Sequence, residues 1–321
     1  MHPQGPNPAP AMDDDVDPQL RQFMRRMAEG YVGHPPLDGL PLDQVRRITA
    51  RVREQWGTGG PEMATREDVD ADGVRVRILR PTIDAALPLL VYLHGGGWTL
   101  FSIDTHDRLM REYAARAGVA IAAVDYSLSP EVRYPHAQDE TVAAIGWLRA
   151  HGAAHGIDPS RMAIGGDSAG ANLAITSQLR LRDAGLPTVS AMLLNYGVFS
   201  DQATASWSRY DGARYMLECV EMQGFWHNYL ADQAQRGDPL VMPLLADLRG
   251  LPPAFMAIAA CDILADGNHA MAAALRGAGV AVEAREYAGA THSFLEAMSV
   301  SDLANRAIDE SSAWLRQALS A

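Results

Sequence analysis

Apolar segments typical of buried strands alternate along this chain with helical segments, and this alternation most restricts its fold. LPLLVYLHGGG, VAIAAVDY and RMAIGGDS are nearly continuous apolar runs, as found in strands covered on both faces of a sheet. VSAMLLNYGV, PPAFMAIAACD and VAVEAREYAG repeat the pattern, while GVRVRILRP alternates as a half-buried strand does. We expect the intervening helices at 104–117, 137–150, 169–183, 268–277 and 302–319. Such an order needs right-handed crossovers, so it predicts a mostly parallel, doubly wound α/β sheet.

Two regions do not fit the alternation. DPQLRQFMRRMAEG and PLDQVRRITARVREQWG each begin with Asp or Pro and end at glycine, as helices do. Both are too short to fold alone, so their apolar faces must pack on another part of the chain. A second helical segment, GARYMLECVEMQGFWHNYLADQ, is inserted between two strands. We therefore expect amino-terminal helices within 1–60 and a core over 61–321, interrupted by an insertion at about 199–237.

Composition excludes several classes of protein. The chain has 321 residues and a net charge of −12 with no lysine- or arginine-rich block, whereas binding to nucleic acid needs clustered cations. No apolar run approaches the ~18–20 residues that span a bilayer. The proline-rich, acidic amino end lacks the features of a signal peptide, and we expect it to be frayed. Cys219 and Cys261 cannot form a disulfide framework or a four-thiolate zinc site, which favours reduced thiols and a cytoplasmic location.

The stretch RMAIGGDSAGANLA joins a buried strand to a helix through Gly-x-Ser-x-Gly, with Ser168 at its centre. In that setting the pattern is typical of a nucleophile elbow, in which a strained turn exposes the serine at the start of a helix. The positive end of the helix dipole also points at the serine. Larger residues at Gly166 or Gly170 would clash with the strand and the helix. The alternative, a glycine-rich packing turn, stays open on this motif alone.

A serine that attacks a carbonyl group needs donors for the oxyanion that forms. YLHGGGW ends an earlier buried strand, and its three glycines allow consecutive backbone N–H groups to turn inward as a cradle for negative charge. The N–H of Ala169, at the head of the helix, would complete the cradle. A phosphate-binding loop is disfavoured, because neither Gly-Lys-Ser/Thr nor Gly-x-Gly-x-x-Gly is present there.

The general base and its carboxylate follow from chain order. His292, in YAGATHSF, follows the last strand and precedes the final helix, where the order Ser…Asp…His places the base. AIAACDILAD supplies Asp262 directly at the end of the preceding strand. Asp266, one helical turn further, is the rival carboxylate, with a cap or pairing role in the next helix as its alternative. Of the other histidines, we expect His94 and His106 to support the glycine loop, and His227 could line a pocket.

Taken together, HGGGW, GDSAG, CDILAD and GATHSF resemble, in order and context, the hormone-sensitive lipase-like branch of the α/β-hydrolase esterases. DYSLSPE and YPHAQDE look like that branch's DYRLAPE and FPAALED, so the likeness runs from about Met63 onward. The resemblance implies an α/β-hydrolase fold with an eight-stranded sheet. It also implies that Gly96 and Gly97 act with Ala169 as oxyanion donors. The amino-terminal helices and the insertion would form a helical cap over the site.

The chain departs from that pattern at three positions. Ser127 and Ser129 replace the usual Arg and Ala of DYRLAPE, so a structural ion pair made by that arginine must be lost or remade. Ile263 stands where proline is common, which alters the loop beside Asp262. None of these changes affects the catalytic set.

These observations predict a serine carboxylesterase that hydrolyses short- to medium-chain acyl esters through an acyl-enzyme. Ser168 would be the nucleophile, His292 the base and Asp262 its partner, with no metal or cofactor. Candidate wall residues of the acyl pocket are Trp98, Phe101, Met216, Phe225 and Trp226. Two other functions stay open: an amidase or formamidase with the same triad, and a catalytically inactive ligand-binding relative. The amino-terminal helices could instead be a peripheral arm that joins two copies in a homodimer.

Overall fold

An eight-stranded sheet runs through the centre of the protein in the computed structural model, which describes residues 15–83 and 85–320. The strand order is β1-β2-β4-β3-β5-β6-β7-β8, with β1 and β2 antiparallel to their neighbours and the remaining pairs parallel. The expected mostly parallel, eight-stranded α/β fold is therefore confirmed. The amino end that we expect to be frayed lies outside the described residues. The strands are β1 Thr65–Ala71, β2 Val74–Arg80, β3 Leu87–Leu93, β4 Ala120–Val124, β5 Ile157–Asp167, β6 Ala191–Asn195, β7 Ala254–Cys261 and β8 Val282–Thr291.

The edge strand β1 is the one strand of this sheet that no apolar run in the sequence marks. Its sequence, TREDVDA, alternates between half-buried and exposed side chains, because the edge of the sheet is wet on one face. Asp72 and Gly73 connect it to β2 with φ values of 57° and 90°. Two central residues with positive φ give a turn whose twist matches that of a hairpin. The Asp-Gly pair is thus the sequence signal for this strand.

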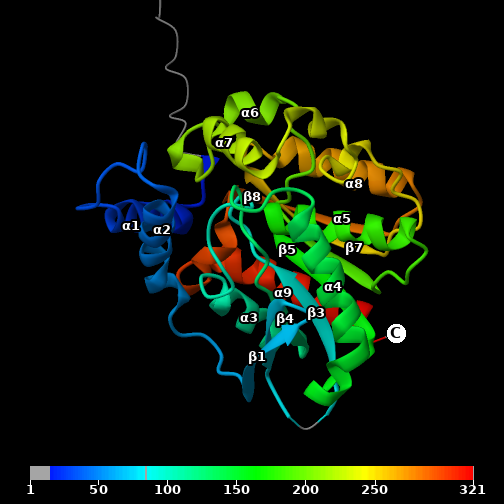
Figure 1. Cartoon of the computed structure of the whole chain (residues 1–321). Helices are drawn as coiled ribbons and strands as arrows, with labels where there is room; N and C mark the ends of the chain where they lie inside the picture. The colour runs from blue at the N-terminus through cyan, green and yellow to red at the C-terminus, as the bar shows by residue number, and fades with distance from the viewer. Residues whose placement is uncertain (1–14, 84, 321) are drawn as a thin grey trace, which may run out of the picture.

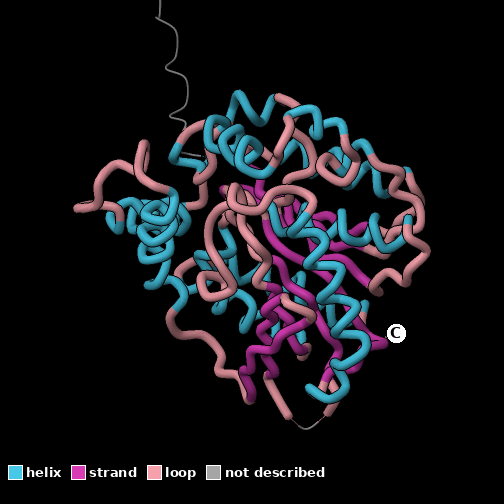
Figure 2. Tube along the Cα trace, in the orientation of Figure 1, coloured by secondary structure: helices cyan, strands magenta, loops and turns pink. Residues whose placement is uncertain are grey.

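Helices cover both faces of the sheet (Figures 1 and 2). The apolar side chains of α4, α5 and α8 form one core with one face of the strands, whereas those of α3 and α9 belong to the core on the other face. The apolar runs in the strands are buried on both sides for this reason. These helices are α3 Asp107–Ala117, α4 His136–His151, α5 Ala169–Asp183, α8 Ala265–Gly277 and α9 Asp302–Ala318.

The amino-terminal helices are α1 Pro18–Gly30 and α2 Leu42–Gly57, and they pack on the α3 and α9 side of the molecule (Figure 1). The Asp17 side chain caps α1 by accepting hydrogen bonds from the first backbone N–H groups. The rings of Phe23 and Trp56 meet edge-on at 4.6 Å and join the two helices. Their apolar faces are therefore continuous with the core.

The insertion between β6 and β7 is broken into short elements where the sequence suggests one helical segment. Gly212 has φ 134° and Met216 has φ 74°, and both values interrupt a helix. A continuous helix begins only at Cys219, where Glu218 and Glu221 form a capping box. The elements are α6 Ala205–Arg209, η3 Ala213–Tyr215, α7 Cys219–Tyr229 and η4 Gln233–Gly237; the other short 3₁₀ helices are η2 Gly152–His155, η5 Pro243–Leu245 and η6 Phe294–Ser299.

The two cysteines lie in different parts of the fold, and both thiols are free. Cys219 begins α7 in the insertion, and Cys261 ends β7 in the sheet, where its Sγ lies 3.3 Å from the carbonyl oxygen of Asp15. Burial raises the pKa of each thiol to about 11. No helix among residues 15–83 and 85–320 is both long and apolar enough to cross a membrane.

Candidate active site

Ser168 stands at the turn between β5 and α5 with φ 55° and ψ −117°, a strained conformation for a residue with a side chain. The turn passes so close to β3 that a Cβ added at Gly166 or Gly170 would overlap the carbonyl oxygen of Leu93. Glycine is therefore required on both sides of the serine, and the packing itself lifts Ser168 off the sheet.

A continuous chain of hydrogen bonds joins Ser168, His292 and Asp262. The Ser168 Oγ lies 3.0 Å from His292 Nε2, and His292 Nδ1 donates to Asp262 Oδ2 at 2.7 Å. The backbone N–H of Leu264 donates to the other oxygen of Asp262 at 3.0 Å, which fixes the carboxylate. The side chains of Ser168, His292 and Asp262 are all buried. This geometry lets a neutral imidazole accept the serine proton while the carboxylate stabilises the imidazolium that forms.

The electrostatics of His292 reflect two opposing effects. Burial lowers its pKa, but the carboxylates of Asp262, Asp167 and Glu296 together outweigh burial, so the pKa lies above its ordinary value. Tyr196, which sequence reasoning missed, places its ring edge-on to the imidazole at 5.3 Å. Its position directly after β6, where parallel strands end beside the site, is the signal that could have identified it.

The rival carboxylate has a different partner. Asp266 Oδ2 accepts a hydrogen bond from the backbone N–H of Ser206 at 2.9 Å, and the Ser206 hydroxyl donates to the carbonyl of Ile263 at 2.8 Å. These contacts hold α6 against the turn that carries Asp262. Ile263, at the position where the resemblance implies proline, is buried, and its carbonyl is the one that accepts the Ser206 hydroxyl.

The oxyanion turn, residues 95–100, follows β3. Gly96 and Gly97 have φ values of 113° and 59°, and the Gly96 carbonyl accepts hydrogen bonds from the N–H groups of Thr99 at 3.0 Å and Leu100 at 2.8 Å. The N–H groups of Gly96 and Gly97 bond to no described residue. That of Ala169 opens α5, where the first N–H groups have no partner within the helix. The turn and the helix can thus supply donors to an anionic oxygen.

A second polar cluster lies beneath the elbow. Asp167 accepts a hydrogen bond from the Tyr92 hydroxyl at 2.8 Å, and His106 Nε2 lies 3.4 Å from its other oxygen. Burial raises the pKa of Asp167, but His106, Tyr92 and His94 together outweigh burial, so the pKa lies below its ordinary value. His94 bonds through Nδ1 to the carbonyl of Gly95 at 2.7 Å, and burial lowers its pKa to about 3. The neutral His94 and the His106–Asp167 pair therefore contact the base of the oxyanion turn, and neither histidine is part of the Ser168 chain.

Two of the five candidate wall residues belong to the core. Trp98 and Trp226 are fully buried, with ring centroids 4.6 Å apart, and Trp98 stacks on Tyr229 at 4.2 Å. Both indoles are therefore packed among other side chains, and their place in the wall of an enclosed acyl pocket stays a prediction. Trp98 belongs to the oxyanion turn, so the contact between its ring and that of Trp226 joins the turn to α7.

The other three candidates are half-buried. Phe225 lies against the oxyanion turn so closely that a Cβ at Gly97 would overlap its ring. Phe101 follows the same turn, and Met216 packs with the core that contains α1 and α2. His227 is exposed on α7.

The serines that replace the family's Arg and Ala make new contacts. The Ser127 hydroxyl and backbone N–H both donate to the Glu140 carboxylate at 2.6 Å. The Ser129 hydroxyl donates to the Val132 carbonyl at 2.9 Å. Two hydrogen bonds to a carboxylate thus stand where the resemblance implies an arginine. Among residues 15–83 and 85–320, no group of three or more His, Cys, Asp or Glu side chains is placed to hold a metal ion.

Comparison with known proteins agrees with the fold described above. Residues 90–296 match the family model described as the alpha/beta hydrolase fold. The chain belongs to the α/β-hydrolase family. The resemblance seen in its motifs is thereby confirmed.

Similar members of the α/β-hydrolase family carry esterase names. The chain is 33% identical over 281 residues to an acetyl esterase of Salmonella schwarzengrund, covering 86% of each chain. Among solved structures, an ester hydrolase from the metagenome of Lake Arreo, in complex with a derivative of bipyridine phosphonate, is 31% identical, with a TM-score of 0.88 over 95% of this chain and 100% of that one. A thermostable esterase from Pseudomonas putida is 30% identical, with a TM-score of 0.88 over 98% of this chain and 99% of its own.

Proposed function

We infer that this α/β-hydrolase is a serine carboxylesterase with Ser168 as nucleophile, His292 as general base and Asp262 as the partner of the base. The observation that carries the inference is the unbroken chain of hydrogen bonds from Ser168 Oγ through His292 to Asp262. Its esterase-named relatives, similar over most of the chain, support the same reaction class.

In the first half of the reaction, neutral His292 accepts the Ser168 proton as Oγ attacks the ester carbonyl. The N–H groups of Gly96, Gly97 and Ala169 stabilise the tetrahedral oxyanion. Protonated His292 then gives its proton to the departing alcohol, which leaves an acyl-enzyme. Water, activated by the same imidazole, attacks the acyl-enzyme and releases the carboxylic acid.

The substrate that we propose is an ester with a short- to medium-chain acyl group. The ring of Phe225 lies directly against Gly97 and narrows the space beside the oxyanion turn. We propose that helices α1 and α2 and the insertion at about 199–237 act as the cap of this pocket. A relative named acetyl esterase supports a small acyl group. We further propose a cytoplasmic location, in keeping with the two free thiols.

The test is Ser168→Ala, measured on aryl acetate, butyrate and octanoate esters. We expect kcat to fall by about 10³-fold or more, because the nucleophile is lost. The control is Ser177→Ala, which removes a buried hydroxyl without a hydrogen-bond partner from the same helix. A variant at Ser168 that keeps the wild-type rate would overturn the proposal.

A fluorophosphonate probe separates the alternatives. It should label the folded wild-type protein at Ser168, whereas absence of both labelling and turnover would favour a ligand-binding relative. An anilide and a formamide, assayed beside the esters, test the amidase and formamidase alternatives. The same triad serves all three reactions, so faster turnover of either amide would move the assignment to that class.

A further inference from the structure

Helix α2 carries two arginines that reach toward opposite parts of the active site. Arg46 and Arg53 are seven residues apart, which places them on one face of the helix, about 10.5 Å from each other along its axis. Neither side chain is freely solvated: Arg46 is 23% exposed and Arg53 is 10% exposed. Their partners lie in the two segments that position the reacting groups.

Arg46 binds the oxyanion turn. Its Nε donates to the carbonyl of Thr99 at 2.8 Å, and one Nη donates to the carbonyl of Ser129 at 2.8 Å. Both Nη atoms also bond to the two oxygens of Glu131 at 2.8 Å. This forked ion pair fixes the direction of the guanidinium, so Arg46 holds the turn at a defined distance from α2.

The turn held by Arg46 determines where an oxyanion donor points. The Gly96 carbonyl and the Gly97 N–H belong to one peptide plane and point in opposite directions. The N–H of Thr99 bonds to that carbonyl, and the Thr99 hydroxyl donates to the Gly97 carbonyl at 2.9 Å. Thr99 thus orients two successive peptide planes, and Arg46 fixes Thr99.

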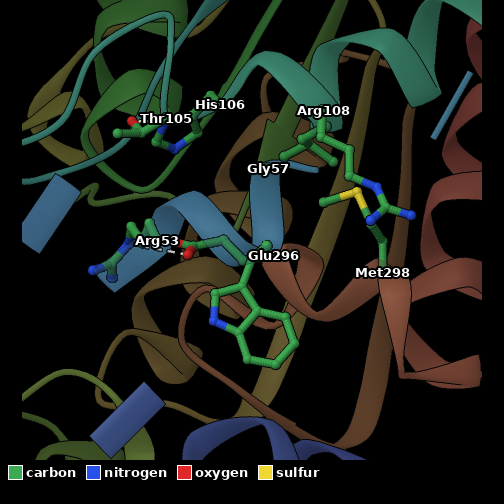
Figure 3. Close-up of a pocket in the computed structure, with 9 residues that line it drawn as sticks. Arg53, Gly57, Thr105, His106, Arg108, Glu296 and Met298 are labelled. Carbon is green, nitrogen blue, oxygen red and sulfur yellow. Dashed lines mark hydrogen bonds and ion pairs between the residues drawn. The ribbon is translucent and has the colours of Figure 1, made fainter. Parts of the chain in front are cut away.

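Arg53 contacts both Phe101, which follows the oxyanion turn, and Glu296, in the segment after the base. Figure 3 shows its ion pair with Glu296. Its guanidinium lies 3.9 Å from the centroid of the Phe101 ring, and a Cβ added at Gly96 would come within 2.7 Å of that ring. On the other side, Arg53 Nε lies 3.0 Å from Glu296, whose side chain is 13% exposed. Glu296 lies in η6, four residues after His292. The half-buried side chain of Arg53 therefore joins the oxyanion turn, through Phe101, to the segment that follows the base.

We propose that Arg46 and Arg53 are positioning residues through which α2 sets the distance and orientation between the oxyanion turn and His292. Neither arginine contacts the reacting atoms. The proposal rests on the proposed function for the identity of those atoms. It assigns α2 an effect on turnover that goes beyond covering an acyl pocket, because a misplacement of about 1 Å at the reacting groups can cost ~10²-fold in rate.

The charge of Glu296 gives the proposal a second readout. Acidic groups on each neighbouring element act on His292: Asp167, Asp262, Glu221 and Glu296. Arg53 is the ion-pair partner of Glu296. Loss of the guanidinium leaves the Glu296 charge uncompensated and raises the pKa of His292, whereas loss of the carboxylate lowers it.

The kinetic test compares Arg53→Met and Arg46→Met with Arg53→Lys on an aryl acetate. We expect each Met variant to lose about 10–100-fold in kcat with KM changed by no more than about threefold, and Lys to restore part of the loss at Arg53. The matched control is Arg47→Met, from the same helix, where an exposed arginine pairs with exposed Asp43. It should keep the wild-type kcat.

The second test does not depend on turnover. NMR titration of the histidine ring nitrogens should show a lower pKa for His292 in Glu296→Gln and a higher one in Arg53→Met. Because Arg53→Met leaves a buried carboxylate unpaired and can impair folding, the double variant Arg53→Met/Glu296→Gln is measured beside it. With neutral groups at both positions, it should fold and still show the reduced kcat.

Some outcomes would overturn the proposal. If kcat stays at the wild-type value in folded Arg53→Met, in Arg46→Met or in the double variant, α2 does not position the site. A change in KM or melting temperature alone would assign the arginines to substrate binding or to structure. Failure of the proposed function looks different: the wild type would hydrolyse no ester, yet the NMR titration would still report the electrostatic effect of Glu296 on His292.

Discussion

The elbow around Ser168 and the contacts of α2 hold the same active site by different means. The serine is held by backbone, since β3 runs so close to Gly166 and Gly170 that no side chain fits. The oxyanion turn and the segment after His292 are held by long side chains from a helix more than forty residues earlier in the chain. Backbone packing tolerates almost no change, whereas a side-chain contact can be weakened by degrees. The nucleophile should therefore be the rigid element of the site, and the position of the base the adjustable one.

The strongest test of the backbone-built region is Gly170→Ala. The new Cβ would overlap the carbonyl of Leu93 in the neighbouring strand, so we expect a loss of about 3 kcal/mol or more in the free energy of unfolding and no activity in the soluble fraction. Chemical denaturation and aryl acetate turnover measure the two effects.

Gly146→Ala is the matched control, because a Cβ at this helical glycine in α4 meets nothing within 4 Å. It should leave activity unchanged and add about 0.5–1 kcal/mol to stability, since alanine favours a helix interior. If the two variants have the same free energy of unfolding and the same turnover, close packing at Gly170 has no more effect than packing at a glycine in an ordinary helix.

A smaller effect than that of Gly170→Ala is expected from substitutions of the two carboxylates near the base, Asp262 and Asp266. Asp262→Asn should reduce kcat by about 10³-fold, because the amide no longer fixes the imidazole tautomer. Asp266→Asn, whose carboxylate bonds to Ser206 in α6, should keep a rate near that of the wild type. Steady-state kinetics of both variants decide between them, and a larger loss at Asp266 would reverse the assignment.

The smallest effect is the pH dependence of the wild type. His292 must be neutral to act as a base, so activity is present above its pKa and is lost as the pH falls through it. Burial lowers this pKa, but Asp262 and the neighbouring carboxylates together outweigh burial, so the midpoint of the acid limb should lie above 6.5, the ordinary pKa of histidine. The measurement is kcat/KM from pH 5 to 9, and a flat profile would argue against a histidine base.

The core of the fold could be predicted from the sequence because its signals are local. Each buried strand is a continuous apolar run, and the helix expected at 169–183 has the observed bounds of α5. The motif around Ser168 is equally local, as its glycines and serine are neighbours in sequence. The edge strand β1 escaped detection because polar residues form most of it.

The residues that support the site could not be found in this way. Nothing in the sequence around Arg46 or Arg53 separates them from the exposed arginines of the same helix, since their role depends on what lies beside α2. The aromatic residues pose the same difficulty. Trp98 and Phe225 flank one site, but only the packing of the insertion decides that the first is buried and the second half-exposed.

The two free thiols can serve as separate chemical reporters, one in the insertion and one in the sheet. Cys219 begins the helix of the insertion and is half-buried, whereas Cys261 ends β7 and is buried, so only Cys261 needs a local opening to be reached. With a pKa of about 11, both are almost fully protonated at neutral pH and react slowly with alkylating reagents in the closed protein. Alkylation rates followed by mass spectrometry would then report how often the sheet opens at Cys261, with the partly exposed Cys219 as an internal reference and without any introduced label.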